Sequence, residues 1–171
     1  SYAVTDDWAV YSNVQSSFLA PQANQIELTG QEQSLDAQTA WTYELGTRGS
    51  ILEGALQPDL TFYWIDYEGR IERDPDFNDV FLNRANTRHN GVELAVTGQL
   101  DRVSRRLEGL QWHGSLSYND SEFTNGDFDG NTVPQAPHWL ASFDLLYRDK
   151  DSGLWAGMGG FHVGEAYSDS E

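Results

Sequence analysis

Four histidines offer the most obvious metal-binding chemistry in this chain of 171 residues. His89, His113, His138 and His162 are separated by 24, 25 and 24 residues. A preformed metal site usually takes two ligands from nearby positions of one helix or strand, and no such close pair occurs here. The spacing therefore predicts about one histidine per structural element and no metal site.

A second candidate metal site is the acidic stretch Asn125-Gly126-Asp127-Phe128-Asp129-Gly130, which resembles the start of a calcium-binding loop. The twelfth position of such a loop must supply a bidentate glutamate, and Ala136 stands there instead. The match fails at its most demanding ligand. We interpret the stretch as an acidic turn.

Side chains that could perform catalysis lack the surroundings that catalysis needs. The segment Gly114-Ser115-Leu116-Ser117 has the pattern of a strand and lacks the sharp strand-to-helix turn that exposes a catalytic serine. Asp120 and Glu122 could be drawn as a glycosidase pair, but any acidic loop offers such a pair. The chain has no cysteine, which excludes a thiol nucleophile, thiolate metal sites and disulfides in this stretch. We predict that the protein is not an enzyme and uses no cofactor.

The composition narrows the class of protein further. The chain carries 27 acidic and 10 basic residues, a net charge of −17, which repels phosphate backbones and excludes nucleic acid as a partner. No stretch of 18 consecutive apolar residues occurs, so no transmembrane helix is expected, although membrane-spanning strands would leave no such stretch either. The chain opens with Ser1 and shows no signal peptide, and we expect it to be an internal piece of a longer precursor. Its 16 glycines and 13% aromatic residues favour an all-β fold.

The segment from Leu110 to Asn119 carries the clearest structural pattern in the sequence. Leu, Trp, Gly, Leu and Tyr alternate there with Gln, His, Ser, Ser and Asn. A β-strand sends successive side chains to opposite faces, so this strand has one apolar, aromatic-tipped face and one hydrated face. The apolar face needs either a second sheet, as in a soluble sandwich, or lipid, as in an outer-membrane barrel.

Six further segments have a similar alternation, which predicts an antiparallel up-and-down meander of about seven long strands. The other strands are expected at residues 8–18, 39–47, 60–70, 88–100, 139–147 and 154–167. Long and short connections alternate along the chain, with irregular stretches at 74–84 and 121–137, so one end of the sheet should carry loops and the other turns. This segregation, the length of the strands and the Trp and Tyr residues near their ends are typical of outer-membrane barrels.

Short motifs resemble those of TonB-dependent outer-membrane receptors, in the order in which that family has them. Tyr43-Glu44-Leu45-Gly46-Thr47-Arg48 is similar to the family's Tyr-Glu-x-Gly-x-Lys/Arg strand, and residues 60–67 are similar to its Phe-Tyr-x-x-Asp-Tyr strand. Asn86, followed by Gly91-Val92-Glu93-Leu94, resembles its Asn and Gly-Val-Glu segment. Further likenesses are a proline-containing strand entry at 134–138 and a Tyr-x-Asp ending at 167–169. The family-like motif residues are Tyr43, Glu44, Gly46, Asn86, Gly91 and Glu93.

The resemblance implies that residues 1–171 are part of the wall of a 22-stranded transmembrane β-barrel, with the plug and the terminal strands absent from this piece. Seven strands cannot close such a barrel, so further strands are expected. The resemblance also implies the outer membrane of a Gram-negative bacterium, contact with outer-membrane lipid, coupling to TonB through the plug segment, and import of an iron chelate. The siderophore and ferric-citrate branch is the most similar.

The motif glutamates and glycines have structural interpretations. Glu44 and Glu93 fall on the polar phase of their strands, and we interpret them as lumenal carboxylates that pair with Arg48 or Arg88 or stay hydrated. Gly46 and Gly91 are expected to permit a close approach or a bulge.

Arg84 and Arg88 are the candidate ligand-binding residues. They lie at the mouth of the strand expected at residues 88–100, at the loop end, where cations attract an anionic iron chelate. The alternative is that they neutralise Asp74, Asp76 and Asp79.

Two rival classes stay open on the sequence alone. The first is a soluble β-sandwich that binds glycans, in which the apolar faces of two sheets pack together. The second is a secreted β-rich hydrolase. A fragment that is monomeric and folded in plain buffer would favour the sandwich, and hydrolysis of a glycan would favour the enzyme.

Overall fold

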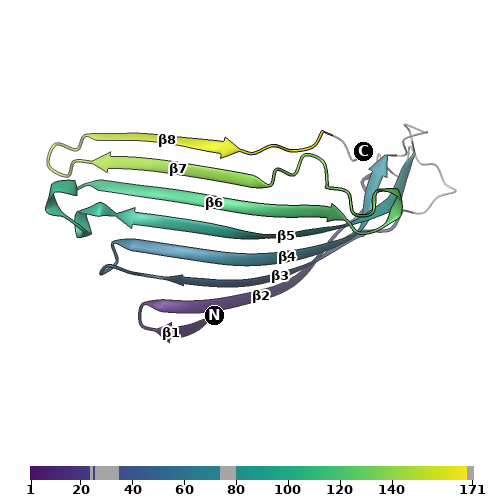
Figure 1. The fold of residues 1–171 in the computed structure, drawn as a ribbon, viewed down its shortest axis with the longest axis horizontal. Helices are drawn as coiled ribbons and strands as arrows, with labels where there is room; N and C mark the ends of the chain where they lie inside the picture. Colours follow the sequence, from purple (N-terminus) through teal and green to yellow (C-terminus); the bar gives the residue numbers. More distant parts are fainter. Residues whose placement is uncertain (24, 26–34, 74–79, 169–171) are drawn as a thin grey trace.

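The computed structural model describes residues 1–171 except 24, 26–34, 74–79 and 169–171. The described residues form one antiparallel sheet in which each strand pairs with the next along the chain (Figure 1). Its eight strands are β1 Tyr2–Thr5, β2 Trp8–Leu19, β3 Gln38–Gly49, β4 Leu56–Arg73, β5 Phe81–Gln99, β6 Leu110–Phe123, β7 Trp139–Arg148 and β8 Trp155–Val163. Three 3-10 turns are η1 Leu100–Arg102, η2 Arg105–Leu107 and η3 Gly126–Phe128. The predicted all-β meander is confirmed.

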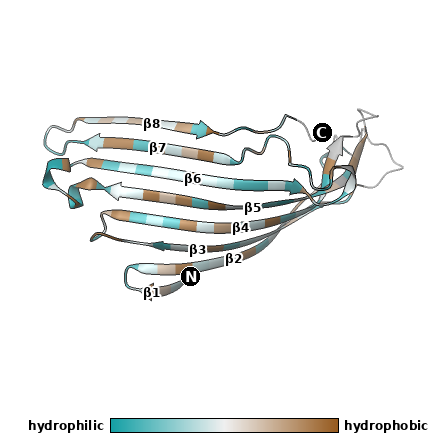
Figure 2. Cartoon of the chain, in the orientation of Figure 1, coloured by the Kyte–Doolittle hydropathy of each residue, from teal (hydrophilic) through white to brown (hydrophobic). Residues whose placement is uncertain are grey.

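Strand register sorts the side chains onto two faces, because directly paired residues point the same way. One row across the sheet pairs Leu45 with Phe62, Phe62 with Val92, and Val92 with Tyr118. The neighbouring row pairs Glu44 with Tyr63, Tyr63 with Gly91, and Gly91 with Asn119. Figure 2 shows hydrophobic and hydrophilic residues alternating along the strands. We call the side with Leu45 and Phe62 the apolar face and the side with Glu44 and Tyr63 the polar face.

The apolar face is not covered by protein. Leu116 is 44% exposed and Phe143 is 49% exposed, although both belong to the apolar face. The described residues form no second sheet, so the sandwich interpretation, which needs these side chains interlocked in a dry interior, is wrong. Within the described part of the chain, no helix is both long and apolar enough to cross a membrane.

The connections separate by length onto the two ends of the sheet. Residues 20–37, 74–80 and 124–138 connect strands at one end, which we call the loop end. Residues 6–7, 50–55, 100–109 and 149–154 connect them at the other, the turn end. The predicted segregation is therefore confirmed (Figure 1).

Several predicted strand limits were wrong. Strand β1 was missed because four residues are too few to show a period. Strand β5 begins at Phe81, inside the stretch 74–84 predicted to be irregular, and β6 continues to Phe123, inside the predicted loop 121–137. The last strand ends at Val163 and does not reach residue 167.

Both strand extensions serve a small core at the loop end. Ala85, Phe123 and Val133 are buried together, and Phe128 packs against them with its ring centroid 5.7 Å from that of Phe123. The aromatic residue in η3 thus fastens the connection between β6 and β7 onto the end of the sheet. The predicted acidic turn at 125–130 is anchored by this hydrophobic contact.

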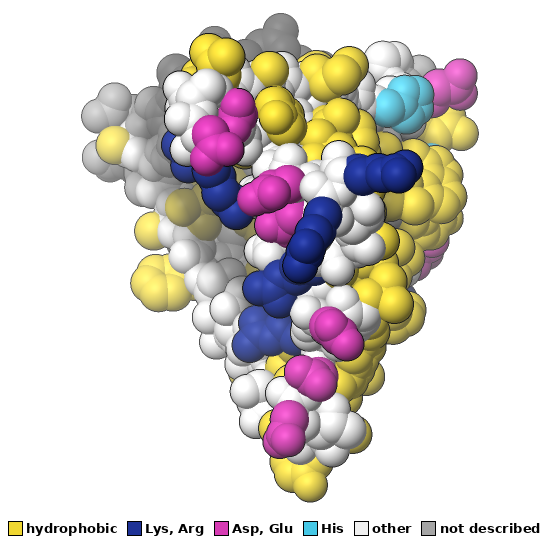
Figure 3. Space-filling view, turned by 90° about the vertical axis from the view of Figure 1, so that its left-hand side faces the viewer, with side chains coloured by type: hydrophobic (Ala, Val, Ile, Leu, Met, Phe, Trp, Pro, Cys, Tyr) yellow, Lys and Arg dark blue, Asp and Glu magenta, His cyan; other side chains and the backbone are white. Residues whose placement is uncertain are grey.

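The turn end combines tight turns with exposed charge. In the connection between β7 and β8, Asp149 accepts hydrogen bonds from the Ser152 hydroxyl at 2.6 Å and the Asp151 N–H at 3.0 Å. These bonds, chiefly that of Ser152, hold the pKa of the Asp149 carboxyl below its ordinary value. Figure 3, which views this end, shows Lys and Arg side chains in a band across it and hydrophobic side chains along one side.

Candidate functional site

The polar face is organised by tyrosine rings that lie across glycines of the next strand. Tyr11 of β2 pairs with Gly46 of β3, and a Cβ at position 46 would overlap the Tyr11 ring. Because the glycine leaves room, the Tyr11 hydroxyl reaches β4, where it donates to Asp59 at 2.7 Å and lies 2.6 Å from the Thr61 hydroxyl. Gly46 is therefore the close approach that the sequence predicted, without a bulge at that position.

The same arrangement recurs two strands further along. Tyr63 of β4 lies over Gly91 of β5, and its hydroxyl donates to Asn119 of β6 at 2.9 Å. The Asn119 amide donates to Ser121 at 2.6 Å, and Ser121 hydrogen-bonds with His89 at 2.9 Å. The polar face thus holds a network that spans three strands. Tyr11, Tyr63 and Asn119 were missed by sequence reasoning, although each lies on the polar phase of its strand.

A hollow of about 340 Å³ opens on the polar face beside this network. It is lined by Glu44, Thr61, Tyr63, Ile65, His89, Glu93 and Asn119. Both motif glutamates lie on the polar face, as their phase predicted, and the structure also brings them to one hollow. Asn13 donates to Glu44 at 3.4 Å, and no ion pair to either glutamate occurs among the described residues. The hollow presents two carboxylates to whatever fills the space in front of this face.

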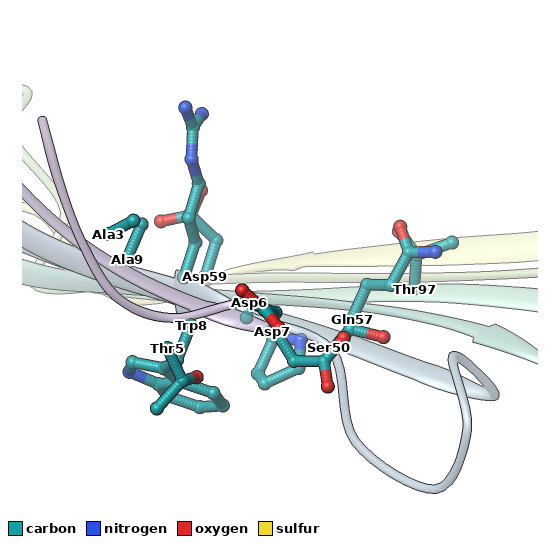
Figure 4. Close-up of a pocket in the computed structure, with 13 residues that line it drawn as sticks. Ala3, Thr5, Asp6, Asp7, Trp8, Ala9, Ser50, Gln57, Asp59 and Thr97 are labelled. Atoms are coloured by element: carbon teal, nitrogen blue, oxygen red, sulfur yellow. The ribbon is translucent and has the colours of Figure 1, made fainter.

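Arg48 lies on the polar face but does not pair with Glu44. Its guanidinium carbon is 5.6 Å from the centre of the Tyr11 ring, in a cation–π position. Arg48 also borders a hollow of about 490 Å³ at the turn end, which Asp6, Asp7 and Asp59 line as well. Figure 4 shows Trp8 and Asp59 of this hollow on opposite sides of the ribbon, so it wraps around the rim of the sheet.

Arg88 lies on the apolar face, where it completes a row of charged residues. Its Nε is 3.1 Å from Asp66, its Nη1 is 3.7 Å from Glu122, and its guanidinium stacks 4.7 Å above the ring of Trp64. The expectation that Arg88 pairs with a lumenal glutamate is therefore wrong, because Glu93 faces the other way. Arg84 lies in β5, but its side chain is outside the described residues. The alternative partners Asp74, Asp76 and Asp79 also lie outside them.

The remaining motif residues have local structural roles. Asn86 accepts the backbone N–H of Gly69 at 3.0 Å, at a bulge in β4 where Gly69 has a φ of +70°. Its own N–H donates to the side chain of Asn125 at 2.6 Å. Tyr43 lies on the apolar face beside Trp41, with ring centroids 6.4 Å apart. Asn86 thus joins the bulge to the connection between β6 and β7.

The histidines are distributed over three strands and one connection, as their spacing predicted. His89 hydrogen-bonds with Thr87 and Ser121, His113 with Thr97, and His138 with the carbonyl of Asn119. Among the described residues, no three His, Asp or Glu side chains gather closely enough to hold a metal ion.

Aromatic side chains border the apolar face at both ends. Toward the loop end they are Trp41, Tyr43, Trp64, Tyr118 and Trp139; toward the turn end they are Trp8, Trp112 and Tyr147. Trp155 of β8 pairs with Arg148 and so lies on the polar face. Apolar residues such as Leu94, Leu116 and Phe143 lie between the two groups. An apolar band between aromatic girdles, backed by a wet polar face, is the construction of a transmembrane β-barrel wall.

The family comparison agrees with this construction. The family model described as "TonB dependent receptor-like, beta-barrel" matches residues 1–171, and the chain belongs to this family. The pesticin receptor of Yersinia pestis is 29% identical over 143 residues, which are 82% of this chain and 20% of the relative. The ferric-pyoverdine 358 receptor of Pseudomonas putida is 29% identical over 154 residues, 86% of this chain and 17% of the relative. The chain spans about a fifth of the length of these relatives.

Solved structures show the same relationship. The ferric citrate transporter FecA in its unliganded form is 28% identical, with a TM-score of 0.69 over 87% of this chain and 22% of that one. The ferric yersiniabactin uptake receptor FyuA from Yersinia pestis has a TM-score of 0.73 over 99% of this chain and 25% of that one. Its sequence identity is 24%, so this likeness shows the fold alone. These relatives are named as receptors and transporters; none of these names describes an enzyme or a glycan-binding module.

Proposed function

We propose that this chain forms eight strands in the wall of a 22-stranded TonB-dependent outer-membrane transporter that imports an iron chelate, a siderophore or ferric citrate. The membership of all 171 residues in the receptor barrel family supports this proposal. The relatives named for pesticin, ferric pyoverdine and ferric citrate support the substrate class.

The observation that carries the proposal is the division of one sheet into two faces. Large apolar side chains that stay about half exposed, such as Leu116 and Phe143, cost free energy in water and are stabilised in lipid. The opposite face is hydrated and hydrogen-bonded across strands, as a lumen requires. This arrangement and the family membership support a location in the outer membrane of a Gram-negative bacterium.

The hollow with Glu44 and Glu93 supports a role for the polar face in holding the contents of the barrel. A carboxylate that loses water without gaining a cation or hydrogen bonds is strongly destabilising. A plug that fills the lumen and receives the energy of TonB therefore has to bring basic or hydrogen-donating groups to this hollow. Transport then consists of binding at the loop end, movement of the plug and release toward the turn end.

Uptake of radioactive iron tests the proposal. Cells that express the receptor containing this chain are given ⁵⁵Fe as ferric citrate, as ferric yersiniabactin or as a ferric pyoverdine. We expect uptake of one chelate that disappears when either the receptor gene or TonB is deleted. Equal uptake with and without the receptor, for all three chelates, would contradict the proposal.

Arg84 and Arg88 remain our candidates for attracting an anionic chelate at the loop end. Replacing both with Gln in the full receptor is expected to weaken uptake of the anionic chelate, and unchanged uptake would remove this role. The single variant Arg88→Gln distinguishes the contribution of Arg88 to uptake from that of Arg84. Arg88 faces the apolar side and is already paired with Asp66.

A further inference from the structure

An apolar groove lies on the apolar face at the turn end, along strands β7 and β8. It has a volume of about 190 Å³ and is lined by Leu110, Leu145, Tyr147, Ala156, Gly157 and Met158. Ala156 is small and pairs with the large Tyr147, so space remains above Ala156. Leu145 and Met158 form the next pair along the strands on the same face. Met158 is 71% exposed at its edge. The groove is thus a lengthwise depression in the surface that we assign to lipid.

Basic side chains lie immediately beyond the end of this groove. Leu110 and Tyr147 are followed toward the turn end by Gly109 and Arg148, whose backbones are joined by a 2.8 Å hydrogen bond. The Arg148 side chain alternates to the polar face, so the cations on the groove side come from the connections beyond it. Lys150 lies 3.8 Å from Glu108, which joins the connection between β7 and β8 to the end of η2. Arg105 and Arg106 of η2 are exposed. Neither forms an ion pair within the part of the chain that the structure describes.

The basic charge of the chain is concentrated at this point. Five of its ten basic residues are Arg102, Arg105, Arg106, Arg148 and Lys150, all within residues 102–106 and 148–150. Arg102 is occupied, because it donates to the carbonyl of Glu53 at 3.0 Å. The band of Lys and Arg in Figure 3 reaches the hydrophobic side of the molecule. The same two regions of the chain also hold the carboxylates Asp101, Glu108, Asp149 and Asp151, so residues 101–108 and 148–151 together carry a net charge of +1, a local exception in a chain with a net charge of −17.

From this juxtaposition we propose that the turn end is a binding site for an anionic phospholipid. One acyl chain lies in the groove between Tyr147 and Met158, and the phosphate is held by the guanidinium groups of Arg105 and Arg106, with Lys150 shared between the phosphate and Glu108. Guanidinium forks bind phosphate oxygens in a bidentate manner. The proposal rests on the proposed function, since the groove meets lipid only if the sheet spans a membrane.

The depth of the basic residues fits a head group. Trp112 and Tyr147 mark the membrane interface at the turn end, because tryptophan and tyrosine concentrate at head-group level. Arg105, Arg106 and Lys150 lie in the connections directly beyond those aromatic residues. A phosphate at that level can therefore meet the guanidinium groups while its acyl chain follows the strands. At the loop end the corresponding charged row contains Asp66 and Glu122 around Arg88 and offers no comparable anion site.

The test uses the complete receptor that contains this chain, purified in detergent and offered equal amounts of phosphatidylglycerol and phosphatidylcholine with identical acyl chains. Native mass spectrometry counts the lipids that each protein retains. We expect wild type to retain more phosphatidylglycerol than phosphatidylcholine. In the double variant R105Q/R106Q, the ratio of retained phosphatidylglycerol to phosphatidylcholine should fall about fivefold for each guanidinium removed. The double variant R105K/R106K should keep only part of the preference, because the charge is unchanged but the bidentate fork is lost.

A second variant tests the groove independently of charge. Ala156→Leu fills the groove and should reduce retention of both lipids without changing their ratio. The matched control is Arg48→Gln, which removes one charge at the turn end from the polar face and should leave the ratio unchanged. Equal retention of the two lipids by wild type, or an unchanged ratio in R105Q/R106Q, would overturn the proposal, and unchanged retention in Ala156→Leu would remove the groove from it.

Failure of this site and failure of the proposed function give different results. Each variant is checked for its amount in the outer membrane and for TonB-dependent iron uptake. A receptor that inserts and imports iron but shows no phosphatidylglycerol preference contradicts the lipid site alone. A wild-type receptor that does not enter the outer membrane contradicts both.

Discussion

The two faces of this sheet carry side chains that interact in different ways, although one backbone bears both sets. On the polar face, tyrosines lie over glycines and reach across a strand, so that Tyr11 contacts β4 and Tyr63 contacts β6 through directional hydrogen bonds. On the apolar face, most side chains between the two aromatic groups are aliphatic or aromatic, and many stay largely exposed. The side chains of the polar face are held by hydrogen bonds of defined geometry. Those of the apolar face are determined by the lipid that we expect them to meet. A substitution should therefore be judged by the face on which it falls.

The largest expected effect is a charge placed on the apolar face. Leu116→Arg should lower the free energy of unfolding of the receptor in lipid vesicles by about 2–4 kcal/mol, because a cation then faces hydrocarbon. The measurement is a guanidinium titration followed by tryptophan fluorescence. Ser117→Arg, one residue further on and on the polar face, is the matched control. If the two variants lose equal stability, the assignment of the faces is wrong.

The next effect concerns the glycines of the polar face. Gly91→Ala should cost about 1–3 kcal/mol, because the new Cβ collides with the carbonyl oxygen of Tyr118 and with the Tyr63 ring. The same titration measures the loss. Gly160→Ala in β8 is the comparison, since nothing lies within 4 Å of a Cβ built there. A Gly91→Ala variant as stable as Gly160→Ala would show that Tyr63 moves away without cost.

A smaller effect distinguishes tyrosines of the two faces. Tyr63→Phe removes the hydroxyl that donates to Asn119 and should cost about 1 kcal/mol. Tyr43→Phe removes a hydroxyl from the apolar face, where the structure gives it no hydrogen bond among the described residues, and should be close to neutral. Both are read as changes in the free energy of unfolding. The reverse order would mean that the polar network does not stabilise the sheet.

The smallest effect is expected at the charged row on the apolar face. Arg88→Gln removes the ion pairs with Asp66 and Glu122, but the Arg88 side chain is 35% exposed, so solvent screens the pair. The expected loss is below about 1 kcal/mol. A loss of several kcal/mol would place this row at hydrocarbon depth, below the head groups. The depth of the aromatic girdle at the loop end would then need revision.

The sequence predicted the class of fold because alternation is a local property. The phases of Trp41, Tyr43 and Leu45, and of Leu110 to Tyr118, are those found in the structure. The face on which Arg88 lies could also have been predicted, because Val92 and Leu94 are at even spacings from it and point to the apolar face. Its pairing with a lumenal glutamate was predicted wrongly because charge was considered without phase.

The contacts between strands could not be predicted in the same way. The overlap of Tyr11 with Gly46 depends on the register of two strands separated by the connection 20–37, and a shift of one residue would send the ring to the other face. The extension of β6 to Phe123 depends on a core with Ala85 and Val133, which no local pattern reveals. Register and long-range packing thus account for what sequence reasoning missed.

Strands β4 and β5 have 18 and 19 residues, far more than the roughly 9–11 that cross a bilayer. Their excess projects beyond the aromatic girdle at the loop end as paired, hydrogen-bonded backbone. The backbone of this part of β4 and β5 lost its conformational entropy when the protein folded. A molecule that binds there would not have to order it. Contacts made with this part of the rim would therefore carry little ordering cost, and would favour rapid capture over slow rearrangement.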